Sequence, residues 1–482
     1  MIAPFPLRQA RKETVKNTKA SNLENRRVGF RDYISQYKRI MALGLPVLLA
    51  QAGQIMVGIV DNVMIGHIGE TELAAASFTN TIFNIALIFG MGFSFAMTPI
   101  IGMAKGEEND KAVDSGLWNG MIANLAIGVV LTLAMLLLSL GVNHMGQPES
   151  ILPMAKEYLY ILILSLMPLM FFYASKQFSE GISDTKTSMQ IILTANVFNI
   201  IGNYLLIYGK FGFPELGLAG AGWATTASRF LMALLYIIVF LKRKSYQKYT
   251  LALSPTLTAK KEIKKAFQLG LPIGGQLVMV ASAFGMTTIM MGWLGETALA
   301  AHQVVISLST LGFMIYQGVS VSTTIEVSNG YGRKDLEGMS TSVKASVHII
   351  ILLALLSASI FYTFREQLPS FYTNELGVIA QAIPFMMILA IYQLPDALSI
   401  IYQAALRGVA DVKVPAMITF ISYFIIGIPS SYLLAFKFDM GPSGIWWGLP
   451  IGLSIAAILE GCRYYLIMRR LEYRKIGEKV AA

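Results

Sequence analysis

Charged residues and cysteines are scarce in this sequence of 482 residues. Only 14% of the residues are Asp, Glu, Lys or Arg, whereas a soluble domain usually has about 25%. The single cysteine, Cys462, excludes an internal disulfide, so nothing in the sequence requires an oxidising compartment. The short alternating segments that are typical of outer-membrane barrels are also absent. The composition therefore argues against a soluble cytosolic protein and against a barrel.

Motifs for nucleotide-driven or enzymatic chemistry are missing as well. No Gly-Lys-Ser/Thr loop occurs, which argues against ATP-driven transport by this chain. The glycines at 217–222 and 330–332 do not follow a strand, so helix packing explains them better than nucleotide binding. The four histidines are scattered and no His-Glu-x2-His is present, so we expect no metal site. We therefore expect neither an enzyme nor a nucleotide-binding protein.

Apolar residues, in contrast, are abundant. They make up 55% of the chain, the mean hydropathy is +0.59, and long apolar runs such as Gly120–Leu140 occur. A bilayer core of about 30 Å needs roughly 20 apolar residues per helix. We expect an all-α polytopic membrane protein with twelve transmembrane helices, at residues 40–66, 73–100, 117–142, 152–175, 187–209, 217–241, 266–292, 298–325, 343–363, 378–405, 413–436 and 442–468.

Lysine and arginine residues gather on one side of this predicted membrane protein. That side receives 33 of the 38, including those of both termini and of the connection 242–265. The other side receives Lys156, Lys210, Arg365 and Lys437, while Arg229 falls within a helix. The positive-inside rule therefore places both termini and the 242–265 connection in the cytoplasm. We expect a multi-pass protein of the plasma (inner) membrane, whose net charge of +10 reflects cytoplasmic loops rather than nucleic-acid binding.

The sequence contains an internal repeat. Leu43-Gly44-Leu45-Pro46 recurs as Leu269-Gly270-Leu271-Pro272, and the segment 69–75 resembles 295–301, both at an offset of 226 residues. Gly92 corresponds to Gly318 and Gly106 to Gly332 in the same register. An even number of helices in each half gives both halves the same orientation. Such repeats are typical of secondary transporters, which bind substrates near the midplane between the repeats.

The repeat predicts five segments. These are a basic cytoplasmic arm (1–39), an N-terminal lobe with helices 1 to 6 (40–241), a cytoplasmic linker loop (242–265), a C-terminal lobe with helices 7 to 12 (266–468) and a cytoplasmic tail (469–482). The carboxylates within the helices do not follow the repeat. Asp61 corresponds to Thr287, and Asp396 corresponds to Leu169. This asymmetry is the pattern expected where the scaffold alternates and a few positions carry ion chemistry.

Several of these motifs together resemble the multidrug and toxic compound extrusion (MATE) family, in particular its bacterial NorM-like branch. The resemblance covers about residues 36–470 and rests on the Leu-Gly-Leu-Pro repeats and on four motifs, which are Gln54-x3-Gly58-x2-Asp61, Ala300-Ala301-His302-Gln303, Leu406-Arg407-Gly408 and Tyr208-Gly209-Lys210-Phe211-Gly212. It implies two six-helix lobes in a V-shaped arrangement that export organic, often cationic compounds in exchange for Na⁺ or H⁺. It also points to Asp61, Asn199, Asn203, Tyr392 and Asp396 as residues of cation or proton coupling.

The residues themselves support this assignment. A carboxylate at bilayer depth costs on the order of 3 kcal/mol or more and needs a reason. Asn199 and Asn203 share one face of a helix, at a depth similar to that of Asp61, and these oxygens suit Na⁺ or a proton on the aspartate. Asp396 follows Pro395 and lies one turn after Tyr392, where an apolar environment disfavours the charged form of a carboxyl group. The alternatives are helix-packing hydrogen bonds and, for Asp396, a capping or paired structural role.

Other intramembrane residues are weaker candidates. Gln54, Met286, Thr287 and Met290 are candidates for lining the substrate cavity. Arg229 could neutralise an acid, bind a lipid headgroup or form a structural ion pair. Glu326 and Glu460 lie near helix ends, where side chains that extend toward water would explain the presence of acidic residues.

We therefore expect a monomeric secondary antiporter that exports small organic compounds and uses no cofactor other than H⁺ or Na⁺ as the coupling ion. The alternatives are a lipid-linked saccharide flippase, which would need a more basic cavity, and a membrane-embedded enzyme. Where NorM-like members often have a glutamate in helix 7, this chain has Val280. Asp396 is then the single carboxylate at this depth in the C-terminal lobe. One carboxylate supplies too few oxygen ligands for Na⁺, but it can hold one proton. The sequence therefore favours H⁺ coupling, with Na⁺ at Asp61 as the alternative.

Overall fold

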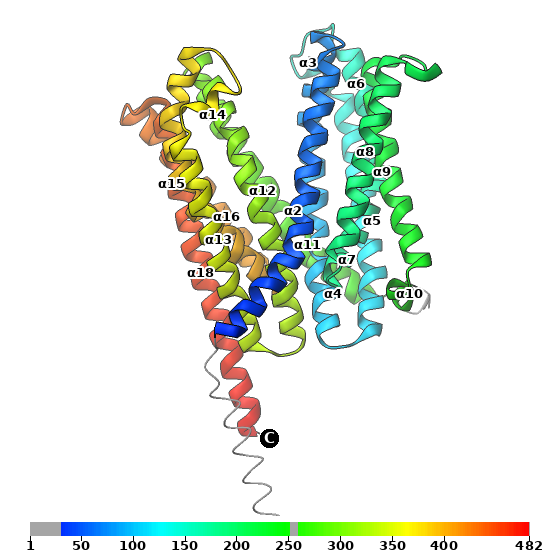
Figure 1. The fold of residues 1–482 in the computed structure, drawn as a ribbon, viewed down its shortest axis with the longest axis vertical. Coiled ribbons are helices and arrows are strands. Elements are labelled where there is room, and N and C mark those ends of the chain that lie inside the picture. The colour runs from blue at the N-terminus through cyan, green and yellow to red at the C-terminus, as the bar shows by residue number, and fades with distance from the viewer. Residues whose placement is uncertain (1–29, 251–258, 482) are drawn as a thin grey trace, which may run out of the picture.

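The computed structural model describes residues 30–250 and 259–481 of the chain. The regular elements of these residues are helices (Figure 1). Eleven helices are long and apolar enough to cross a membrane, and a bent pair supplies a twelfth span. The predicted all-α polytopic architecture is therefore confirmed.

Six spans form the N-terminal half. They are α2 (Phe30–Gly66), α3 (Glu70–Ser94) with α4 (Met97–Gly106), α5 (Asp110–Leu140), the bent pair α6 (Leu152–Leu164) and α7 (Leu166–Gly181), α8 (Thr185–Tyr208) and α9 (Gly217–Lys242), with the short turns η1 (Val142–His144) and η2 (Lys210–Gly212). A short helix, α10 (Lys244–Thr250), follows α9.

Six further spans form the C-terminal half. They are α11 (Lys260–Trp293), α12 (Glu296–Gly332), α13 (Leu336–Thr363), α15 (Leu376–Gly408), a span made of α16 (Lys413–Phe420), the π-helical η4 (Ile421–Gly427), α17 (Ile428–Tyr432) and the π-helical η5 (Leu433–Lys437), and finally α18 (Gly441–Ala481). The short α14 (Gln367–Ser370) connects α13 to α15.

Several helices extend beyond their predicted ends, and three of these extensions change the predicted segments. The helix α2 begins at Phe30 rather than at 40, α11 begins at Lys260 rather than at 266, and α18 continues through the predicted tail to Ala481. The early turns of α2 pack against α13, where the hydroxyl of Tyr37 lies 2.9 Å from Nδ1 of His348. Residues 30–39 are therefore part of the first helix rather than of an arm. Residues 1–29 of that predicted arm, 251–258 of the predicted linker and residue 482 lie outside the described residues.

One span is bent by 42°, between α6 and α7. Pro168 lies in the first turn of α7 and has no N–H group with which to continue the α-helical hydrogen bonds across the break. The hydroxyl of Ser165, at the break, donates a hydrogen bond of 2.5 Å to the carbonyl oxygen of Leu162. The sequence predicted one helix over 152–175, and the structure has a break in it at Ser165, whose buried hydroxyl also accepts a hydrogen bond from Arg229.

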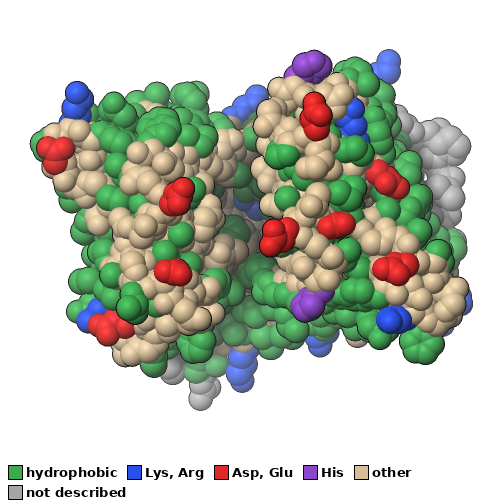
Figure 2. Space-filling model, turned by 90° about the horizontal axis from the view of Figure 1, so that it is seen from above, with side chains coloured by type: hydrophobic (Ala, Val, Ile, Leu, Met, Phe, Trp, Pro, Cys, Tyr) green, Lys and Arg blue, Asp and Glu red, His purple; other side chains and the backbone are tan. Residues whose placement is uncertain are grey.

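The two halves meet at one end of the molecule, through contacts of α12 with α2 and α4 and of α11 with α3. The helix α10 and the C-terminal end of α18 lie at this same end (Figure 1). Seen from the opposite end, the surface is hollowed between the halves (Figure 2). The molecule is thus joined at one end and open as a cleft toward the other.

The contact between the halves repeats with the internal symmetry. A methyl group at Gly106 of α4 would lie 2.2 Å from the carbonyl oxygen of Asn329 in α12. In the same way, a methyl group at Gly332 of α12 would lie 2.1 Å from the carbonyl oxygen of Met103 in α4. Gly106 and Gly332 are repeat partners, and so are Met103 and Asn329, all at the offset of 226 residues. The same close backbone approach is therefore made twice, and it has no room for a side chain.

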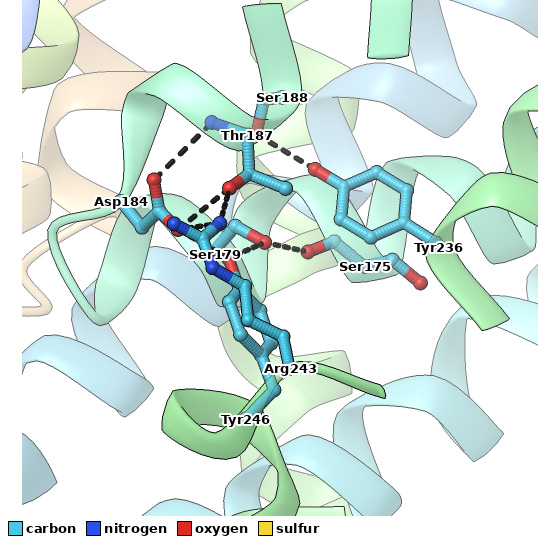
Figure 3. Close-up of polar contacts among 8 residues, drawn as sticks. All are labelled: Ser175, Ser179, Asp184, Thr187, Ser188, Tyr236, Arg243 and Tyr246. Atoms are coloured by element: carbon cyan, nitrogen blue, oxygen red, sulfur yellow. Dashed lines mark hydrogen bonds and ion pairs between the residues drawn. The ribbon is translucent and has the colours of Figure 1, made fainter. Parts of the chain in front are cut away.

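A polar network attaches α10 to the N-terminal half (Figure 3). Asp184 caps α8 by accepting a hydrogen bond from the backbone N–H of Thr187, and it forms an ion pair of 2.9 Å with Arg243. The hydroxyl of Tyr246 donates to the same carboxylate at 2.9 Å. Tyrosine is already a neutral donor at physiological pH, and burial raises the pKa of Tyr246 further above its ordinary value. The chain that leaves α9 is thereby fixed against the start of α8.

Candidate functional site

Asp61 of α2 is held by a chain of amide side chains from α8. Asn203 donates a hydrogen bond from Nδ2 to Oδ1 of Asp61 at 2.5 Å, and the same nitrogen lies 3.3 Å from Oδ1 of Asn199. Asn199 in turn donates to the hydroxyl of Thr225 on α9 at 3.3 Å. The side-chain oxygen of Asn203 is buried and has no partner among the described residues. One carboxylate and several amide and hydroxyl oxygens thus lie together, a set that suits a hard cation or a proton on the aspartate.

This cluster borders a cavity of about 860 Å³ within the N-terminal half. Spans α2, α3, α6, α7, α8 and α9 all contribute to its wall. The wall combines amides, hydroxyls and aromatic rings, among them Gln54, Asn62, Asn80, Asn84, Tyr158, Tyr173, Asn196, Asn199, Thr225 and Ser228. Drug-sized ligands occupy pockets of about 300–1,000 Å³. The cavity is therefore large enough for such a ligand, with Asp61 and Gln54 at its wall.

Arg229, on α9, faces the same cavity. Its guanidinium group donates to the hydroxyl of Ser165 at 2.5 Å, at the bend between α6 and α7. The same group lies 5.2 Å from the centre of the Phe83 ring. Asp61, Tyr158 and Tyr173 are near enough to interact with it electrostatically. The cavity thus contains one acid and one permanent cation, although the sequence left the role of Arg229 open.

Asp396 lies in the C-terminal half, away from this cavity, and is buried on α15. The side chains of Tyr316, Tyr392 and Tyr423 are near enough to interact with its carboxyl group. The hydroxyl of Tyr392 lies 2.9 Å from that of Ser309 on α12. The side chain of Val280 packs against the hydrophobic core of this half. The two predicted acids therefore occupy separate sites, one in each half.

The predicted cavity residues of α11 do not share the cavity of Asp61. Met286 and Met290 border an apolar groove of about 480 Å³ between α11 and the α17–η5 segment. The hydroxyl of Thr287 is buried and donates to the carbonyl oxygen of Phe284 in its own helix at 2.8 Å. Of the predicted cavity residues, only Gln54 borders the polar cavity.

The interpretation of Glu326 and Glu460 as side chains extending into water is wrong. Glu326 is only 3% exposed and pairs with Nε of Arg39 at 2.7 Å. Glu460 is fully buried and accepts a hydrogen bond of 2.8 Å from the hydroxyl of Ser399. Glu326 on α12 is covered by α2 of the N-terminal half, and Glu460 on α18 is covered by α15 of its own half. The sequence of one helix does not indicate whether another segment will bury its end.

Comparisons with known proteins agree with this architecture. The MatE family model matches residues 46–205 and again residues 272–433, once in each half. The multidrug resistance protein MdtK of Proteus mirabilis is 32% identical over 448 residues, which cover 91% of this chain and 97% of that protein. The multidrug resistance protein NorM of Vibrio cholerae is 29% identical over 443 residues, which cover 91% of this chain and 97% of the relative.

Solved structures resemble this fold closely. A eukaryotic MATE transporter has a TM-score of 0.82 at 18% identity, with 92% of this chain and 99% of that chain covered. A multidrug resistance MATE family transporter in an outward-facing conformation has a TM-score of 0.82 at 20% identity, with 90% and 96% covered. At 18–20% identity, the solved structures show only that the folds are alike. The two matches to the MatE family model are matches of the sequence itself. A duplicated six-span half, matched twice by one family model, means that the chain belongs to the MatE family of membrane transporters.

Proposed function

We propose that this protein is a secondary active multidrug exporter, which antiports organic and often cationic compounds against an inward flow of H⁺ or Na⁺. The observation that carries the proposal is the position of Asp61. Its carboxylate lies within a membrane-spanning helix, at the wall of a cavity large enough for a drug, and is held by amides. A carboxylate in this place can hold either the coupling ion or an organic cation. The names of the relatives support the same reading.

The exchange of compound for ion follows if both compete for the carboxylate of Asp61. When the cavity opens to the cytoplasm, the Asp61 carboxylate attracts a cationic compound into a wall of amides and aromatic rings. When the cavity opens outward, an ion that binds to Asp61 removes its negative charge and weakens the hold on the compound. Two ligands that compete for one site, in a protein with two conformations, are sufficient for antiport.

The direction of transport depends on the orientation in the membrane. We place the end at which the halves meet in the cytoplasm, because both termini and the 242–265 segment have most of the basic residues. The helix α10 lies at that end (Figure 1), and the cleft opens at the other (Figure 2). The structure then corresponds to an outward-open arrangement in the plasma membrane. We assign H⁺ as the coupling ion, since Asp396 has tyrosines and an apolar core around it rather than a second carboxylate.

A transport assay tests the proposal. Inverted membrane vesicles that contain the protein should take up a fluorescent cationic dye when a proton or sodium gradient is imposed, and a protonophore or a sodium ionophore should abolish this uptake. Vesicles that contain the Asp61→Asn variant serve as the control for passive entry. Uptake that needs ATP, or no uptake under either gradient, would contradict the proposal. A saccharide flippase would move lipid-linked sugar and ignore the dye.

A further inference from the structure

The guanidinium group of Arg229 has unused hydrogen-bonding capacity inside the N-terminal cavity. It lies near the middle of α9 and has five N–H donors. It donates one hydrogen bond, to Ser165, and faces the ring of Phe83. Within residues 30–250 and 259–481 it forms no ion pair, although the pairs of Glu326, Asp184 and Asp411 with arginines are well formed. Asp61 is near enough to interact with this cation electrostatically but is hydrogen-bonded to Asn203 instead, so no carboxylate contacts the guanidinium group directly.

The hydrogen bond to Ser165 alone does not account for this cation. Burying an arginine at the depth of a membrane is costly unless the charge is paired or functional. The contact with Ser165 requires one N–H donor, and an uncharged donor would satisfy it as well as a charged one. The remaining donors of the planar fork match two oxygen atoms of a carboxylate, a geometry that a single ammonium group does not reproduce.

The other charge of the cavity lies on Asp61. Both side chains border the same space of about 860 Å³, and aromatic rings of Tyr158, Tyr173 and Phe83 stand in its wall. Asn203, which is itself bonded to Asn199, holds Asp61, whereas Ser165 at the bend between α6 and α7 holds Arg229. One acid and one base in a single aromatic-lined cavity are complementary to a flat molecule that has both a cationic and an anionic group.

We propose that Arg229 binds the carboxylate of zwitterionic amphipathic substrates, while Asp61 receives their cationic group. The inference rests on the proposed export function and adds to it a residue that selects among the substrates. Arg229 is then a specificity-determining residue, which favours a zwitterion over the corresponding cation. Substrates without an anionic group need only Asp61 and the aromatic wall, so their transport does not depend on Arg229.

A matched pair of dyes tests this inference. The probes are a rhodamine with a free carboxylate, which is a zwitterion, and its methyl ester, which is a cation. Initial rates of gradient-driven uptake of each dye are measured in inverted vesicles that contain the full chain. The variants are Arg229→Gln and Arg229→Lys. Arg365→Gln serves as the control, because it removes an arginine outside this cavity.

The expected result is a change in the ratio of the two rates. Arg229→Gln should lower uptake of the zwitterion by about tenfold, the effect of losing a hydrogen bond to a charged group, and leave uptake of the ester within about twofold. Arg229→Lys keeps the charge but not the fork, so it should lower the ratio to an intermediate value. If the glutamine variant does not reach the membrane, the ratio measured for the lysine variant decides.

Equal losses for the two dyes, or no change in the ratio for either variant, would overturn the inference. Equal losses for the two dyes would mean that Arg229 positions Asp61, stabilises the bend at Ser165 or binds a lipid headgroup. The proposed export function stands in each of these cases, provided that the wild-type protein takes up the ester under an imposed gradient. A wild-type protein that takes up neither dye would contradict the export function and, with it, the role of Arg229.

Discussion

Asn203 on α8 donates a hydrogen bond of 2.5 Å to the carboxylate of Asp61 on α2. The two residues are separated by 142 positions in the chain. The bond joins the first and fifth spans at the wall of the N-terminal cavity, and Asn199 continues it toward α9. Asp61 is thus held in place without an ion pair in the described part of the chain, which leaves its charge available to a ligand.

Replacement of Asp61 by asparagine should abolish ion-coupled export. Asparagine has nearly the same shape and can still pair with Asn203, but it cannot take up a proton or offer a negative charge. We expect uptake by inverted vesicles to fall to the level of vesicles without the protein, at equal expression and with an unchanged elution volume of the purified protein. Glu149→Gln, which removes an exposed acid, is the matched control. Full drug resistance of cells with Asp61→Asn would show that the assignment is wrong.

Cysteine labelling tests the orientation. In a Cys462→Ser background, Ser245→Cys places the only thiol on α10. A membrane-impermeant maleimide added to intact cells should leave this thiol unlabelled, and should label it after the cells are made permeable. Ser150→Cys, exposed in the loop between α5 and α6, should be labelled from outside. Rapid labelling at 245 in intact cells would reverse the topology.

The pair of Arg39 and Glu326 should stabilise the contact between the two halves. Arg39→Ala leaves a carboxylate that is 3% exposed without the partner that now lies 2.7 Å away. An unsatisfied buried group costs about 1–3 kcal/mol, so the midpoint of thermal inactivation of the purified protein should fall. The double variant Arg39→Gln with Glu326→Gln removes both charges and should recover most of the loss. An equal loss in the single and the double variant would mean that the pair does not act through charge.

The close approach of α4 and α12 makes a prediction for Gly332. Alanine at this position would lie 2.1 Å from the carbonyl oxygen of Met103 and would force the halves apart. Such overpacking typically costs about 1–3 kcal/mol. We expect a lower thermal midpoint and slower dye efflux for Gly332→Ala. The matched control is Gly275→Ala on α11, where an added methyl group meets no atom within 4 Å; unchanged behaviour of both variants would contradict the role of this contact.

The sequence predicted the architecture well because apolar runs and basic loops are local signals. The offset of 226 residues that relates Gly106 to Gly332 appears in the structure as a contact made twice. The shared depth of Asp61 and Asn203 also followed from helix direction, and the hydrogen bond between them is consistent with it. Whether these residues couple ion and substrate movement stays a prediction.

The features that escaped prediction depend on how distant helices pack. Nothing within α18 indicates that Glu460 is covered by α15, or within α12 that Glu326 meets Arg39. Met290 lies on a helix face that borders an apolar groove, and its spacing in α11 does not distinguish that groove from a polar cavity. The bend at Ser165 could have been suspected from Pro168, but its contact with Arg229 required the fold.

The most direct test of the account is proton movement in proteoliposomes made without Na⁺. A pH gradient is imposed across liposomes that contain the purified protein, and a cationic dye is added on the side from which it is exported. The account predicts that the dye crosses against its concentration gradient and that the pH gradient collapses faster as it does so, in the wild type but not in Asp61→Asn. Dye transport that ignores the pH gradient and appears only when Na⁺ is supplied would contradict H⁺ coupling and make Asp61 with its asparagines a sodium site.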